Sequence, residues 1–224
     1  MAKKRVLMVV TGHGEMAPGH PTGIWLSEFA EPYALFREAG CEITVASLRG
    51  GPAPVDPRSL EGVSREGAAA ALKELEATVP LGEVDTAGFA AVFLPGGHGT
   101  MFDLPASQEL ARTIVSFYES GRVVAAVCHG PAGLLGATLS GGAPLVRGKR
   151  VTGFTNEEER ATGLDTLMPF LLEDRLRELG AVFVPAPMWS DHVEQDGRLI
   201  TGQNPQSSVS AAKAVIQALA ETGE

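Results

Sequence analysis

Short apolar runs, each closed by a turn rich in glycine, alternate along this chain with segments of helical periodicity. The runs have the length and the β-branched content of buried strands. Expected strands lie at residues 5–10, 41–47, 90–94 and 122–127, and near 150–154, 181–184 and 198–201. Expected helices lie at 23–39, 65–78 and 106–120, near 165–179, and near 205–221. This alternation predicts an α/β protein with a mostly parallel central sheet and helices on both faces.

Length and loop composition favour a single domain over residues 1–224. A chain of 224 residues with 44% hydrophobic residues can bury a sizeable core. The stretches at 49–57 and 141–144 are rich in Gly and Pro, but they read as long loops rather than as linkers. In open α/β sheets the functional site lies at the carboxyl ends of the strands. We therefore expect the functional residues to lie in the turns that follow the predicted strands.

The charge balance excludes two classes of partner. The formal net charge is −9, and nucleic acids and anionic membranes both require clustered Lys and Arg. No apolar stretch approaches the 18 residues of a membrane span, and residues 2–10 do not resemble a targeting signal. The two cysteines, Cys41 and Cys128, rule out a disulfide scaffold. We expect a cytoplasmic protein with free thiols and no nucleic-acid or membrane partner.

Cys128 is the most informative single residue. It follows the apolar run 123–127 directly and precedes Gly130 and a helical segment. A nucleophile held at a strand-to-helix turn is the arrangement of a nucleophile elbow, here with cysteine in place of serine. A nearby helix N-terminus would favour the thiolate and lower the pKa of the thiol. The alternative is a buried structural cysteine.

His129 is the first candidate partner of Cys128, as a base, as a thiolate partner or as a packing residue. A catalytic imidazole needs a carboxylate behind it. The acidic stretch Glu157, Glu158 and Glu159 follows another predicted strand and supplies three candidates. These residues could equally be the solvated first turn of a helix.

Glu28 lies between Trp25 and Phe29 on the apolar face of the first predicted helix. A carboxyl among aromatic rings should have a raised pKa and could serve as a general acid and base facing Cys128. It could also be a partly exposed helix residue.

The glycine-rich turn after the strand at 90–94 offers backbone donors. The amides of Gly97 and His98 could form an oxyanion hole, although such a turn also serves where the backbone needs positive φ. The five histidines of the chain show no tight metal-ligand spacing, so no metal is expected.

Five separated segments resemble the ThiJ/PfpI superfamily, in particular its heat-shock chaperone and glyoxalase III branch. They are TGIWLSEFAEP at 22–32, LPGGHGT at 94–100, AVCHGP at 126–131, GKRVTGFT at 148–155 and DGRLITGQNP at 196–205. The resemblance implies a flavodoxin-like three-layer sandwich related to class I glutamine amidotransferases. Matched by motif, it implies Cys128 as the nucleophile, His129 as its histidine, Glu28 as the helix glutamate and Glu159 as the triad carboxylate.

The same resemblance implies a stress-response enzyme, a glutathione-independent glyoxalase III-type lyase (D-lactate dehydratase). Its substrate would be methylglyoxal or another small aldehyde, bound as a hemithioacetal on Cys128, with Glu28 moving the proton. The resemblance also implies no cofactor, no metal and a homodimer. The alternatives are a stress-induced holding chaperone, a protein deglycase, a cysteine peptidase and an amidotransferase. His192 and Glu194 formally match an amidotransferase His-x-Glu, but the Gly-x-Gln that follows such nucleophiles is missing after Cys128.

Overall fold

The computed structural model describes residues 3–61 and 65–221. Within these ranges a seven-stranded sheet has the order β10-β11-β7-β6-β1-β4-β5. Its strands are β1 (Arg5–Val10), β4 (Glu42–Ser47), β5 (Val79–Pro80), β6 (Ala91–Leu94), β7 (Val123–Val127), β10 (Val193–Asp196) and β11 (Leu199–Gly202). Every neighbouring pair is parallel except β10 with β11. The mostly parallel sheet is thus confirmed.

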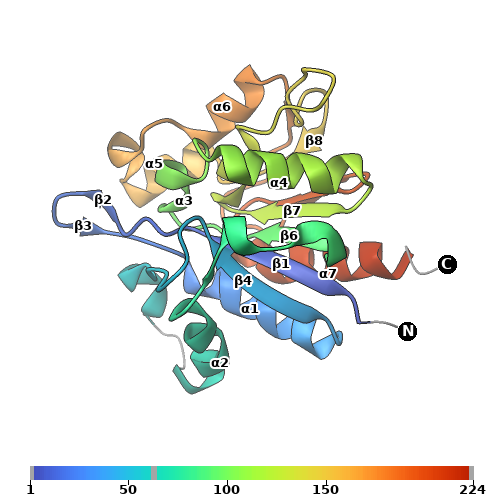
Figure 1. The fold of residues 1–224 in the computed structure, drawn as a ribbon. Coiled ribbons are helices and arrows are strands. Elements are labelled where there is room, and N and C mark those ends of the chain that lie inside the picture. Colours follow the sequence, from blue (N-terminus) through green and yellow to red (C-terminus); the bar gives the residue numbers. More distant parts are fainter. Residues whose placement is uncertain (1–2, 62–64, 222–224) are drawn as a thin grey trace.

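Helices cover both faces of this sheet (Figure 1). The helices α1 (Leu26–Glu38) and α7 (Ser208–Ala220) pack against each other on one face, with α2 (Arg65–Leu75) beside α1. The other face is covered by α4 (Gln108–Glu119), which packs on β6 and β7. Shorter helices are α3 (Thr100–Asp103), α5 (Asn156–Thr162) and α6 (Leu172–Glu178). This arrangement confirms the flavodoxin-like three-layer sandwich.

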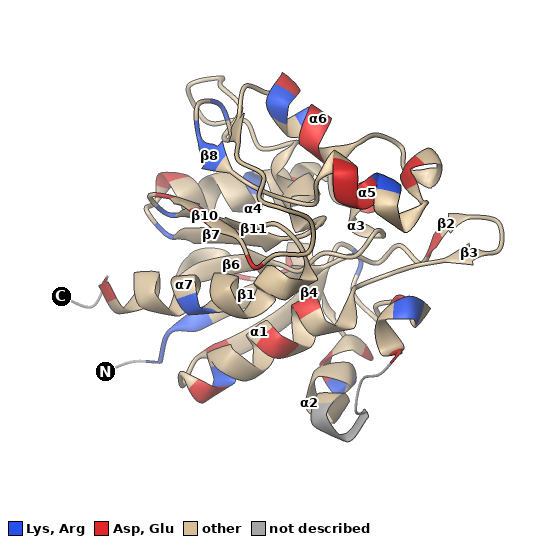
Figure 2. Cartoon of the chain, turned by 180° about the vertical axis from the view of Figure 1, so that it is seen from behind, with Lys and Arg blue, Asp and Glu red and all other residues tan. Residues whose placement is uncertain are grey.

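Burial explains the continuous apolar runs of the sequence. All residues of β6 and β7 are buried, because each of these strands is covered on both faces. Figure 2 shows that acidic residues occur along α1, α5 and α6. Buried hydrophobic side chains from Val6 to Leu219 form one cluster, as a single domain would. Residues 1–2, 62–64 and 222–224 of the domain expected over 1–224 lie outside the described residues.

Two expectations for the second half of the chain need correction. The strands expected near 150–154 and 181–184 are β8 (Arg150–Val151) and β9 (Val182–Phe183), which pair with each other outside the main sheet. The helix expected at 165–179 is only α6, preceded by a 3₁₀ turn at Asp165–Leu167. Pro169 lies between them; proline disfavours helical geometry at the residue before it, and Met168 has extended backbone.

Two hairpins complete the described chain. The strands β2 (Glu15–Ala17) and β3 (His20–Pro21) form an antiparallel pair within the long loop after β1. A tight turn at Gly197 and Arg198 joins β10 to β11, the second antiparallel pair. Among the described residues, every helix is too short or too polar to cross a bilayer.

Candidate active site

Cys128 lies at the sharp turn directly after β7, in the middle of the sheet. Its backbone φ of 59° is a left-handed conformation that is uncommon outside glycine. The turn is held from both sides, because the Cys128 amide donates to the Gly202 carbonyl and the Cys128 carbonyl accepts from the Phe154 amide, each at 2.9 Å. This geometry matches the nucleophile elbow expected from the sequence and places the thiol in the wall of a cavity.

His129 places an imidazole between this thiol and a carboxylate. Its Nδ1 lies 3.4 Å from the Cys128 Sγ, and its Nε2 lies 2.6 Å from Oε2 of Glu159. All three residues are buried. Because Nε2–H of His129 donates a hydrogen bond to the carboxylate, Nδ1 carries the lone pair, and this lone pair faces the thiol. The three side chains therefore have the geometry of a Cys-His-Glu triad.

Of the three consecutive glutamates in the first turn of α5, the third reaches His129. Glu157 is exposed. Glu158 is fully buried but is directed elsewhere, since its Oε2 accepts bonds from the amide and hydroxyl of Thr155, both at 3.0 Å, in a capping box. The geometry thus agrees with the choice of Glu159 that the resemblance implied.

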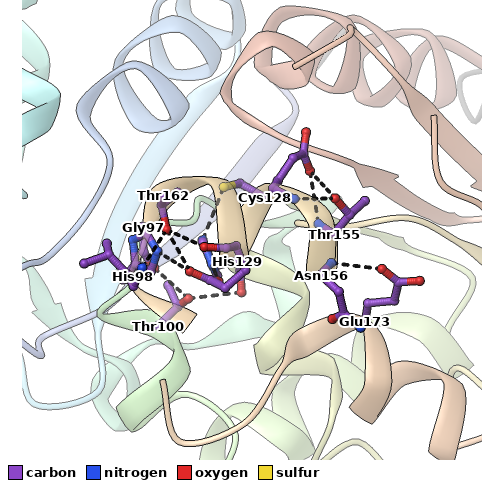
Figure 3. A network of polar contacts seen from close by, with 12 residues as sticks. Gly97, His98, Thr100, Cys128, His129, Thr155, Asn156, Thr162 and Glu173 are labelled. Atoms are coloured by element: carbon purple, nitrogen blue, oxygen red, sulfur yellow. Dashed lines mark hydrogen bonds and ion pairs between the residues drawn. The ribbon is translucent and has the colours of Figure 1, made fainter. Parts of the chain in front are cut away.

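The side chain of His98 is a site residue that the sequence reasoning missed. Its Nε2 lies 2.8 Å from Oε1 of Glu159, and its ring centroid lies 4.2 Å from that of His129 (Figure 3). Nη2 of Arg58 lies 3.3 Å from Nδ1 of His98, which makes Nδ1 the acceptor and Nε2 the donor. This role could have been anticipated from the sheet, because β6 and β7 are neighbouring parallel strands and each ends in a turn that carries a histidine.

The protonation states of His98 and Glu159 depend on their burial and on their contacts with His129. Burial, followed by the nearby His129, lowers the pKa of His98 to about 4, so that the His98 ring is neutral at pH 7. Burial also opposes ionisation of Glu159, but the electrostatic interaction with His129 and the hydrogen bonds from both imidazoles outweigh this effect. The pKa of Glu159 is therefore held far below its usual range, and this carboxylate is the fixed negative charge of the site.

Glu28 projects from α1 to the other side of the thiol and is completely buried. Its Oε2 accepts a bond from the Gly96 amide at 2.9 Å, while its Oε1 has no hydrogen-bond partner among the described residues. The carboxyl interacts with the thiol of Cys128, and burial raises the pKa of Glu28 to about 8. The carboxyl is thus shielded as expected, which favours its protonated form, and its role as the general acid and base stays our prediction.

The thiol itself departs from expectation. Burial, and then the neighbouring Glu28, raise the pKa of Cys128 above its usual value. The helix expected after the turn is a single 3₁₀ turn at Gly130–Leu134, which offers little of the dipole that would stabilise a thiolate. The resting nucleophile is therefore a neutral thiol, and its proton must pass to a base, for which Nδ1 of His129 is in place.

The expected oxyanion donors lie in the same cavity. Gly97 and His98 line it, and no acceptor within residues 3–61 and 65–221 pairs with either of their amides. Gly97 has a φ of 102°, and a Cβ at this position would lie 2.5 Å from the Trp25 nitrogen. Glycine is thus required here by both conformation and space.

A cavity of about 270 Å³ opens at Cys128. Cys128, His129 and Glu28 bring reactive groups to its wall, and Trp25, Phe154 and Trp189 bring aromatic rings. Its lining residues, within the described ranges, are Trp25, Glu28, Arg58, Gly97, His98, Cys128, His129, Phe154, Thr162, Trp189 and Pro205. A small electrophile with one apolar side fits this combination.

Three buried groups could in principle hold a metal ion. The ligand atoms of His98, His129 and Glu159 lie within 4.8 Å of one another. In the structure the carboxylate already accepts hydrogen bonds from both imidazoles, which satisfies their N–H donors. A metal would have to displace both protons, so the absence of a metal stays our prediction.

The amidotransferase pair does not reach the nucleophile. Nε2 of His192 lies 3.3 Å from Glu194 and 3.1 Å from the Val184 carbonyl, and Glu194 also bonds to Arg150. Neither His192 nor Glu194 is among the described residues that line the cavity. The place of a triad histidine beside Cys128 is taken by His129.

Fold and site together define a class of protein: a flavodoxin-like sandwich whose central strand ends in a cysteine elbow backed by histidine and glutamate. Sequence comparison gives this class its family. The DJ-1/PfpI family model matches residues 22–218, so the chain belongs to the DJ-1/PfpI family. The resemblance noted from the motifs is thereby confirmed.

Within this family the chain is similar to enzymes named as glyoxalases. It is 34% identical to the glutathione-independent glyoxalase HSP31 of Saccharomyces cerevisiae, covering 98% of this chain and 99% of the relative. It is 36% identical to the glutathione-independent glyoxalase hsp3101 of Schizosaccharomyces pombe, covering 95% of each chain. The crystal structure of glyoxalase III from Candida albicans superposes with a TM-score of 0.89 at 31% identity, covering 96% of this chain and 97% of that one.

Proposed function

We propose that this chain is a cofactor-independent glyoxalase of the glyoxalase III type. It converts methylglyoxal or a related 2-oxoaldehyde to the 2-hydroxy acid, with water as the only co-reactant. The observation that carries the proposal is the buried, protonated carboxyl of Glu28 beside the thiol of Cys128. A peptidase has no need of a second acid at this point, whereas moving a proton between two carbons requires a group that both donates and accepts. The full-length relatives that carry this activity in their names support the same reading.

The first step forms a hemithioacetal. Nδ1 of His129 takes the thiol proton, and the imidazolium is stabilised by Glu159. The sulfur then attacks the aldehyde carbon, C1, while the neutral carboxyl of Glu28 protonates the aldehyde oxygen. Glu28 becomes a carboxylate at this point, and the raised pKa makes it a stronger base than an ordinary glutamate.

The second step moves hydrogen from C1 to C2. The Glu28 carboxylate removes the proton on C1, giving an enediol, and returns it to C2. The hydroxyl proton on C1 passes to the oxygen on C2, which leaves a thioester of the 2-hydroxy acid. The amides of Gly97 and His98 are available to the oxygen that gains charge. In the third step the Glu28 carboxylate deprotonates a water molecule, which attacks the thioester, and the His129 imidazolium returns its proton to the departing sulfur, so that Glu28, His129 and the thiol all regain their starting states.

The test is conversion of methylglyoxal to lactate by the dialysed protein in buffer free of glutathione. We expect turnover by the wild type and by the control Cys41→Ser, and none by Cys128→Ser, because serine is a far weaker nucleophile. Cys41 is a half-buried free cysteine that does not line the cavity. Equal activity of Cys128→Ser and the wild type would rule out the mechanism.

We further propose that the protein works in the cytoplasm as a homodimer. Two free cysteines suit a reducing compartment, and a dimer is what the family resemblance implies. Sedimentation velocity distinguishes a dimer from a monomer directly.

A further inference from the structure

An aromatic wall runs from the triad to the mouth of the cavity. We use this name for the rings of Trp25, Phe154 and Trp189, which line the cavity together with Cys128. The Phe154 ring centroid lies 4.3 Å from that of His129 and 5.7 Å from that of Trp189. The aromatic wall thus begins beside the reacting groups and continues to the partly exposed ring of Trp189.

Trp189 has a left-handed backbone conformation, which is unfavourable for a residue with a large side chain. Cys128 and Trp189 are the two non-glycine residues with positive φ in the described part of the chain, and φ at Trp189 is 62°. Such backbone persists only where the surroundings impose it, and it concentrates at functional sites. Here the Trp189 amide donates to Oε1 of Glu158 at 2.9 Å.

Glu158 ties the segment around Trp189 to the rest of the molecule. Besides that amide, its Oε1 accepts bonds from Nε2 of Gln203 at 3.1 Å and from Nδ2 of Asn204 at 2.8 Å. Asn204 also donates to the Ser190 carbonyl at 2.8 Å, which pins the residue after Trp189. The position of Trp189 in the aromatic wall is therefore fixed by a network of buried polar side chains, namely those of Glu158, Gln203 and Asn204.

The cavity is larger than methylglyoxal requires. With a volume of about 30 Å³ for each water-sized group, five non-hydrogen atoms fill about 150 Å³. That is roughly half of the 270 Å³ available. By the same count the ten non-hydrogen atoms of phenylglyoxal fill about 300 Å³, so a substrate of that size occupies the whole cavity up to its mouth, where Trp189 is exposed. A planar ring in this position has the aromatic wall to stack on.

We propose that the site is shaped for 2-oxoaldehydes whose ketone carbon carries a flat apolar group, the arylglyoxal class, with Trp189 as a specificity-determining residue. This inference rests on the proposed glyoxalase activity. The dicarbonyl lies against Cys128, Glu28 and the turn amides, and the ring lies against the aromatic wall. Glu158 is the positioning residue that keeps Trp189 in place.

The test compares initial rates on phenylglyoxal and methylglyoxal, with mandelate and lactate measured by chromatography. We expect kcat/KM for phenylglyoxal to exceed that for methylglyoxal by about tenfold or more, mostly through KM. Trp189→Ala should lower this ratio by about tenfold, and Trp189→Phe should restore most of it. The matched control is Met188→Ala, since Met188 is the equally exposed neighbour and is not among the described lining residues. Its ratio should match the wild type.

The outcomes separate the inference from the activity on which it rests. Turnover of methylglyoxal with no preference for phenylglyoxal, or an unchanged ratio in folded Trp189→Ala, overturns the inference and leaves the proposed function standing. Failure of the wild type on both aldehydes overturns the proposed function. Glu158→Gln provides a further check, because a loosened Trp189 should raise KM for phenylglyoxal more than it changes kcat.

Discussion

Glu28 is prepared for two opposite tasks by its surroundings. Its complete burial disfavours the charged form, and the resulting pKa of about 8 lies close to the working pH. An acid with a pKa near the ambient pH can both give and accept a proton at useful rates. Position on α1 alone gives a smaller effect, since Glu31, one turn further along, is exposed and its partial burial raises its pKa less than complete burial raises that of Glu28.

Replacement of Glu28 by glutamine should therefore separate catalysis from folding. Glu28→Gln keeps the size of the side chain but cannot return a proton, and turnover of methylglyoxal should fall by about 10²–10⁴-fold. Alkylation of Cys128 by iodoacetamide should persist, because His129 remains. Glu31→Gln is the control and should have wild-type kinetics. Near-normal turnover by folded Glu28→Gln would contradict the assignment.

Loss of the triad carboxylate should be severe but less complete than loss of the thiol. A glutamine at position 159 can no longer accept from both histidines, so the His129 tautomer is no longer fixed. We expect Glu159→Gln to reduce kcat by about 10²–10⁴-fold, while Cys128→Ala has no measurable rate. Glu157→Gln, an exposed change two residues away, should be neutral. Comparable losses in Glu157→Gln and Glu159→Gln would show that the charge of the turn, rather than the contact with His129, matters.

At this scale the sequence indicated most of the site. Cys128, His129 and Glu28 could be recognised from short stretches of sequence. Cys128 and His129 directly follow an apolar strand, and Glu28 lies on the apolar face of a predicted helix. The selection of Glu159 from three adjacent acids needed the family resemblance, since the direction of each side chain depends on the axis of α5. The roles of the His98 side chain and of Arg58 could not be seen, because the contact of Arg58 with His98 and that of His98 with Glu159 each link positions far apart in the chain.

At the scale of elements, the turn after β6 is the most tightly constrained. A Cβ on Gly97 would collide with backbone atoms of the segment leading into α1, and backbone cannot move aside as a flexible side chain can. The site therefore depends on close contact between two turns. The helix that bears Glu28 begins where this contact is made.

Gly97→Ala should be much more damaging than an alanine at another left-handed glycine. Gly121 has a φ of 73° with no heavy atom within 4 Å of an added Cβ, so Gly121→Ala should cost about 1 kcal/mol for the backbone conformation alone. We expect Gly97→Ala to cost about 2–4 kcal/mol more, because overpacking is added to that strain. Urea unfolding of the two variants measures the difference, and similar midpoints would disprove the crowding argument.

The central elements were predictable and the peripheral ones were not. Runs such as β1 and β7 are buried on both faces, so their composition is almost wholly apolar and their bounds are sharp. The strands β8 and β9 are two residues each, and which partner they choose depends on tertiary packing. Local pattern also overestimated the helix at 165–179, where Pro169 outweighs the apolar periodicity.

At the scale of the whole molecule, the buried carboxyl makes stability depend on pH. In the unfolded chain the pKa of Glu28 is near 4.5, whereas in the folded chain it is about 8. Between these values the unfolded state releases a proton that the folded state keeps. The stabilising contribution is thus fully present below about pH 4.5 and is lost as the pH rises to 8.

Thermal unfolding of Glu28→Gln and the wild type should show this dependence. The melting temperature of the variant relative to the wild type should rise between pH 5 and pH 8.5, by roughly 5–10 °C for a few kcal/mol in a chain of this size. Glu31→Gln serves again as the control and should track the wild type much more closely. A difference that stays constant over this range would mean that Glu28 ionises normally in the folded protein.

The surface offers little to a holding chaperone, which needs a contiguous apolar patch. The large hydrophobic side chains that are exposed in the described chain are Val79, Val182, Met188 and Trp189. Val79 lies in β5 at one edge of the main sheet, and Val182 lies in β9, whose partner strand contacts β10 at the other edge. Met188 and Trp189 are neighbours in one surface loop, and of these two described residues only Trp189 lines the cavity. Of the exposed large hydrophobic side chains in the described chain, Trp189 is thus the one that belongs to the proposed substrate site.

Glu158 and Glu159, adjacent in the first turn of α5, have different structural roles. Glu159 fixes the histidines, and Glu158 fixes the segment that carries Trp189. Because their bonds run to different elements, residues 186–190 can be exchanged for another sequence of the same span without disturbing the proton-transfer groups. The scaffold is in this sense modular: a biocatalyst with a redirected substrate range could be engineered by grafting one surface loop onto an untouched reaction centre.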